Sequence, residues 1–118
     1  MNMINTTFGN DYFEVFLPIS AELTGFTIHE LQAAGQAENY YAYLTEHSDA
    51  AAFSEFLSVS KNILDTSSNK NQLKNAMVSR IVMNPVLSDI ASKIIRLWYL
   101  GTWDGIDISE LSAQEVWA

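Results

Sequence analysis

Apolar residues recur at intervals of three and four along most of this chain, and this spacing constrains its fold more than any other feature. The pattern is clearest in residues 85–100, whose expected inward-facing set is Leu87, Ile90, Ala91, Ile94, Leu97 and Trp98. Such intervals put side chains on one face of an α-helix, whereas a half-buried strand needs strict alternation. No segment alternates convincingly. The sequence therefore predicts an all-α fold, a compact bundle of four to five helices.

Helix breakers and polar segments divide the chain into five predicted helices. Their approximate ranges are 11–24, 27–45, 50–64, 72–83 and 85–100. The polar segment 65–71 is the clearest predicted loop. A capping-box pattern at 112–115 predicts a short last helix or turn.

Specific residues mark several of these boundaries. Gly25 and Gly101 each follow a helix as a C-terminal stop. Thr27 begins a capping box at the second helix, and Asn84 precedes a proline at the first position of the fifth. Pro18 lies inside the first helical pattern and predicts a kink or a late start there.

The size and composition of the chain fit one domain over residues 1–118. Of these residues 48% are hydrophobic, which is enough for a packed core and argues against disorder. The absence of cysteine excludes disulfides, thiolate metal sites and cysteine nucleophiles.

Charge is distributed unevenly. Residues 1–60 hold eight of the 14 acidic residues and no Lys or Arg, whereas residues 61–96 hold all six basic residues. The formal net charge of −8 disfavours contact with phosphate backbones, so we do not expect a nucleic-acid partner. The basic residues are spread out, which favours a solvated helix surface.

The sequence also bears on location. No apolar run approaches the roughly 20 residues that span a bilayer, so we expect no direct membrane insertion. The opening MNMINTTFGNDYF has no charged n-region, apolar h-region or twin arginine. We therefore expect a cytoplasmic protein, or a periplasmic one if a leader has been removed.

Residues suited to catalysis or metal binding are few. His29 and His47 stand at opposite ends of one predicted helix, too far apart to share a metal ion. HExxH, phosphate-binding glycine loops and GxSxG do not occur. We assign no catalytic, cofactor-binding or metal-binding residue to this chain.

Aromatic residues are the stronger signal. Tyr40, Tyr41 and Tyr43 cover nearly all sides of one predicted helix. A half-buried packing helix explains them better than an aromatic interaction surface, although Tyr40 and Tyr43 are candidates for such a surface.

The stretch IIRLWYLGTWDG, residues 94–105, concentrates large rings near a helix end. Trp98 and Gly101 are expected to close the bundle as structural core and left-handed cap. Neighbouring helical residues point about 100° apart, so one core does not easily take both Trp98 and Tyr99. We expect Tyr99 and Trp103 to meet a large partner, in preference to the C-terminal tail, with the acidic segment 103–110 as a polar rim.

Two motifs carry a resemblance to a known family. FLPISAELTGF (residues 16–26) and IASKIIRLWYLGTW (residues 90–103) resemble elements of the small subunit of bacterial membrane-associated, FAD-dependent dehydrogenases of sugars and alcohols. Sorbitol and glucose dehydrogenase small subunits typify that family, in which an FLxLSxxLTG-like element opens the domain and an xIxxxWYxG element lies towards its end. The likeness extends over residues 13–103.

The resemblance implies a non-catalytic accessory subunit. Its partner would be a large flavoprotein subunit of the glucose-methanol-choline type, which carries FAD and the catalytic residues. The small subunit would bind the large one and stabilise it.

Two other functions remain open from the residues alone. The chain is alternatively a self-sufficient small helical enzyme or ligand-binding protein with an apolar pocket. A third hypothesis is an acidic adaptor or inhibitor that binds a basic protein surface.

Overall fold

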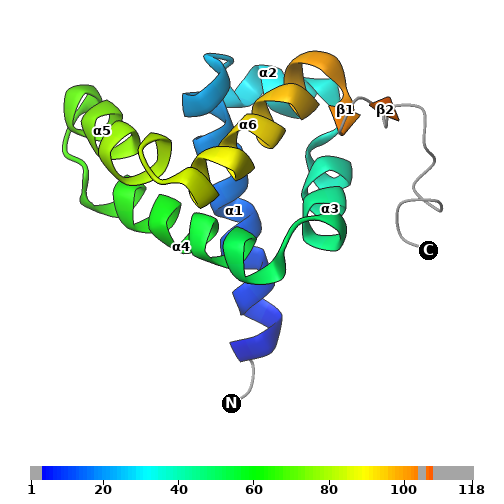
Figure 1. The fold of residues 1–118 in the computed structure, drawn as a ribbon, viewed down its shortest axis with the longest axis horizontal. Helices are drawn as coiled ribbons and strands as arrows, with labels where there is room; N and C mark the ends of the chain where they lie inside the picture. The colour runs from blue at the N-terminus through cyan, green and yellow to red at the C-terminus, as the bar shows by residue number, and fades with distance from the viewer. Residues whose placement is uncertain (1–3, 104–105, 108–118) are drawn as a thin grey trace.

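The computed structural model of this chain describes residues 4–103 and 106–107, with side chains from Tyr12 to Trp103. Within these ranges the fold has six α-helices, one π-helical segment and one short antiparallel strand pair (Figure 1). In chain order they are α1 (Ile4–Thr24), α2 (Ile28–Ala34), α3 (Ala37–His47), α4 (Ala50–Thr66), α5 (Lys70–Met77), η1 (Val78–Val82), α6 (Pro85–Leu100), β1 (Thr102–Trp103) and β2 (Ile106–Asp107). The all-α prediction is confirmed, but the predicted count of four to five helices is too low.

The extra helix comes from a break at Gly35. Thr27 and Glu30 form the predicted capping box at the start of α2, with both reciprocal hydrogen bonds present. Gly35 then adopts a left-handed conformation (φ +74°), which ends the helix after two turns. The predicted helix over 27–45 is therefore two helices, α2 and α3. A single glycine inside an apolar pattern does not reveal by itself whether a helix stops there.

The first helix is longer than predicted. It begins at Ile4, well before Asp11, and continues through Pro18 to Thr24. Gly25 follows with φ +86°, so the predicted stop is confirmed. The predicted helix over 85–100 is also confirmed: the Asn84 side chain accepts hydrogen bonds from the backbone N–H groups of Val86 and Leu87.

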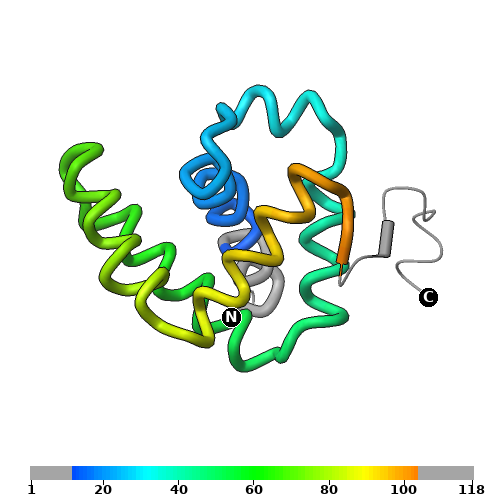
Figure 2. Tube along the Cα trace, turned by 45° about the horizontal axis from the view of Figure 1, so that its top comes forward, coloured from blue at the N-terminus to red at the C-terminus, as the bar shows by residue number. Residues whose placement is uncertain are grey.

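Helices α1, α4 and α6 build the core (Figures 1 and 2). Each contacts the other two, with α6 crossing α1 and the α4–α5 arm extending to one side. The core includes fully buried side chains from all three helices, namely Phe16, Ile19, Phe56, Ile63, Ile94 and Leu97. Five of the six residues predicted to face inward from residues 85–100 are buried, while Trp98 is only partly buried.

The predicted helix over 72–83 begins earlier, at Lys70, and changes from α-helix to π-helix along its length. Asn69 caps α5, and from Val78 to Val82 the backbone is π-helical. Met77 and Ile81 are buried in the core, whereas Val78 is 50% exposed. The predicted loop over 65–71 shrinks to residues 67–69.

No helix in the described part of the chain is long and apolar enough to cross a membrane. The capping-box pattern at 112–115 lies outside the described residues, as does most of the acidic segment 103–110.

Candidate functional site

The two sequence motifs meet in space, although they lie far apart in the chain. The Tyr99 hydroxyl donates a hydrogen bond to the backbone carbonyl of Thr24, across a separation of 75 residues. The ring of Tyr99 also packs on that of Phe26, with 5.0 Å between centroids. The end of α6 is therefore fastened to the turn between α1 and α2, which we call the α1–α2 turn (residues 24–28).

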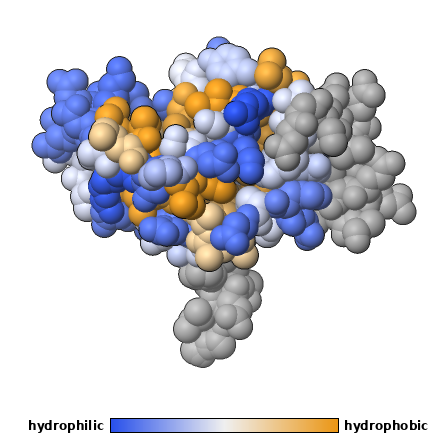
Figure 3. Space-filling view, in the orientation of Figure 1, coloured by the Kyte–Doolittle hydropathy of each residue, from blue (hydrophilic) through white to orange (hydrophobic). Residues whose placement is uncertain are grey.

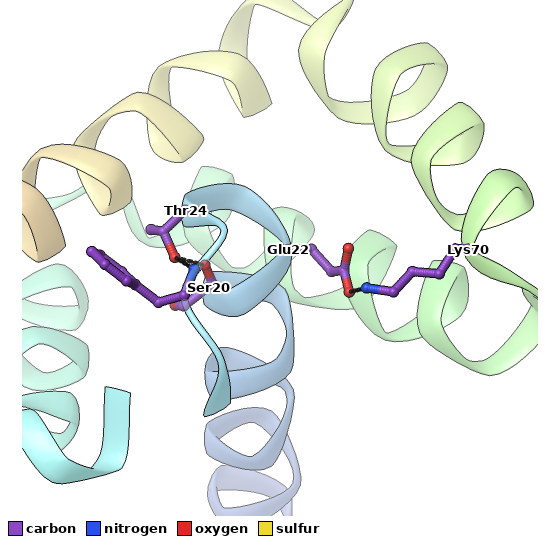
Figure 4. A network of polar contacts seen from close by, with 5 residues as sticks. Ser20, Glu22, Thr24 and Lys70 are labelled. Atoms are coloured by element: carbon purple, nitrogen blue, oxygen red, sulfur yellow. Dashed lines mark hydrogen bonds and ion pairs between the residues drawn. The ribbon is translucent and has the colours of Figure 1, made fainter. Parts of the chain in front are cut away.

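Local hydrogen bonds shape the α1–α2 turn (Figure 4). The Thr24 hydroxyl donates to the Ser20 carbonyl at 2.8 Å and accepts from the Phe26 backbone N–H at 3.2 Å. Gly25 supplies the left-handed residue between them. Nearby, Lys70 reaches from α5 to the Glu22 carboxylate at 3.2 Å, which ties the α4–α5 arm to the end of α1. The Thr24 hydroxyl thus links the last turn of α1 to the backbone of the α1–α2 turn.

Large apolar side chains stay exposed around this junction. The exposed fractions are 55% for Tyr99, 65% for Leu100 and 40% for Ile28. After Leu100, Gly101 adopts the predicted left-handed conformation (φ +66°) and turns the chain away. We call the exposed set Ile28, Tyr99 and Leu100 the junction patch. Tyr99 is thus exposed, as expected for a residue that meets a partner.

Trp103 does not belong to this surface, and the prediction that it is exposed is wrong. Its side chain is only 7% exposed, with the ring of Tyr43 at 5.4 Å and the Lys93 ammonium 4.9 Å from its centroid. The physical reason is the turn at Gly101, after which β1 packs back against α6. The chain itself provides the cover that we expected from a partner.

Tyr40 and Tyr43 are also core residues rather than candidates for an interface. They are 5% and 8% exposed. Tyr40 meets Trp98 edge-on at 4.9 Å, and Tyr43 stacks on His47 at 3.9 Å. Because α2 and α3 are separate helices, α3 can turn its tyrosines towards α6 and β1. The packing interpretation of these tyrosines is the one that the structure supports.

Trp98 closes one side of the core. Its ring stacks near Phe16 at 6.3 Å, but its indole Nε1–H is buried without an acceptor among the described residues. Beside it Phe26, Glu30, Leu31 and Ala34 line a hollow of about 230 Å³. This hollow is one candidate for the apolar pocket of the alternative hypothesis.

Groups able to do acid–base or metal chemistry are scattered. His29 and His47 lie on different helices, α2 and α3, and both are exposed. In the described part of the chain no three His, Cys, Asp or Glu residues gather as metal ligands would. Burial raises the pKa of the Tyr41 phenol, and Tyr12 raises it further. A raised pKa keeps the phenol protonated, whereas a tyrosine that acts as a general base must lose this proton.

Sequence reasoning missed several exposed apolar residues. Ile28 and Leu100 complete the junction patch, and Phe26 supports it, yet none was a candidate. Phe26 directly follows the LTG element, and this position in the motif could have marked it as a candidate. Comparison of the chain with protein-family models, curated proteins and solved structures gives no match.

Proposed function

We propose that this chain is a non-catalytic accessory subunit of a flavin-dependent oxidoreductase that acts on sugars, alcohols or related small molecules. It binds and stabilises a large subunit of the glucose-methanol-choline type, which carries FAD and the catalytic residues. The observation that carries the proposal is the contact of Tyr99 with Thr24 and Phe26. Residues from both family-like motifs form one junction there, and its sequence neighbours Ile28 and Leu100 are exposed.

The junction patch has the properties of an interface anchor. Tyrosine is enriched at interface hot spots, where burial of a large ring contributes much of the binding energy. The hydrogen bond to Thr24 already fixes the Tyr99 ring, so little side-chain freedom remains to be lost on binding. Leu100 has no such constraint and is 65% exposed, which favours burial against another chain.

The hollow beside Trp98 is small for the ligand-binding alternative. Its volume of about 230 Å³ falls below the roughly 300–1,000 Å³ that is usual for small-molecule sites. A small apolar molecule would be its natural occupant, and saturable binding of one by the isolated chain would favour the alternative.

The test is to search the genes beside the one for this chain for a large flavoprotein of the glucose-methanol-choline type and to co-express the two. We expect the two chains to purify together with flavin absorbance. The double variant Ile28→Ser, Leu100→Ser should weaken the complex by about tenfold or more, roughly 1.4 kcal/mol, while the isolated chain keeps its unfolding midpoint. Val82→Ser is the matched control, because Val82 is equally apolar and 53% exposed but lies in η1.

Two outcomes would contradict the proposal. One is a flavoprotein that purifies without this chain and is fully stable alone. The other is an equal loss of binding in the double variant and in the Val82→Ser control, since the junction patch would then have no special role.

A further inference from the structure

We draw no further inference here: the strongest candidate, the exposed apolar surface patch of Val78, Val82, Met83 and Val86 where η1 runs into α6 (Figure 3), carries none because nothing in the described part of the chain shows what covers it.

Discussion

The Tyr99 hydroxyl donates a hydrogen bond to the Thr24 carbonyl, and this contact joins the last turn of α6 to the end of α1. Helix ends leave carbonyl groups without intrahelical partners. Tyr99 satisfies one of them from a distant part of the sequence, while the residue itself stays 55% exposed. One residue therefore serves both the packing of the bundle and the candidate interface.

Removing only the Tyr99 hydroxyl separates its role in the packing of the bundle from its role in the candidate interface. Tyr99→Phe should lower the free energy of unfolding by about 1 kcal/mol, the usual net value of one hydrogen bond. Its ring contact with Phe26 should persist, so binding of the large subunit should change little. Urea unfolding and co-purification measure the two effects. An unchanged unfolding midpoint would mean that the Thr24 contact contributes nothing to stability.

Trp103 should behave as a core residue. Trp103→Ala should destabilise the isolated chain by about 3–5 kcal/mol, as truncation of buried large aromatics does. The variant also removes the contact between Lys93 and the ring. Thermal unfolding of the isolated chain gives the measurement. A loss well below 1 kcal/mol, with the fold intact, would return Trp103 to the surface that the sequence suggested.

Two substitutions of Trp98 separate the contribution of its ring to stability from that of its indole N–H. Its Nε1–H is buried without an acceptor among the residues that the structure describes, and such a group costs about 1–3 kcal/mol. Trp98→Phe removes that group but keeps an aromatic ring beside Phe16 and Tyr40, so we expect stability within about 1 kcal/mol of the unaltered chain. Trp98→Ala should cost several times more. Equal losses in the two variants would show that the indole N–H has a partner in solution.

The raised pKa of the Tyr41 phenol predicts that the folded chain loses stability at high pH. Burial raises its pKa above the ordinary value of 10.0, and Tyr12 adds to the shift. The folded chain therefore holds the phenol proton more tightly than the unfolded chain does, and stability falls as the pH rises above about 10 towards the folded pKa. Unfolding curves of the unaltered chain and of Tyr41→Phe should diverge in that range. Parallel curves would contradict the shift.

The sequence by itself determined the features that depend on three or four neighbouring residues. The capping box from Thr27 to Glu30, the Asn84 cap and the left-handed Gly101 occur as predicted, because each arises from local hydrogen bonds and backbone sterics. The buried face of α6 was also predictable, since its apolar spacing leaves one face for the core.

Only the tertiary structure decided where the remaining rings lie. Trp103 is buried because the turn after α6 carries it back against Tyr43, and Tyr40 is buried because α3 is separate from α2 and packs near Trp98. Tyr99 is left half exposed by its bond to a carbonyl 75 residues away. Helical periodicity gives the direction of a side chain on its own helix, but whether that direction meets solvent depends on segments that approach from elsewhere in the chain.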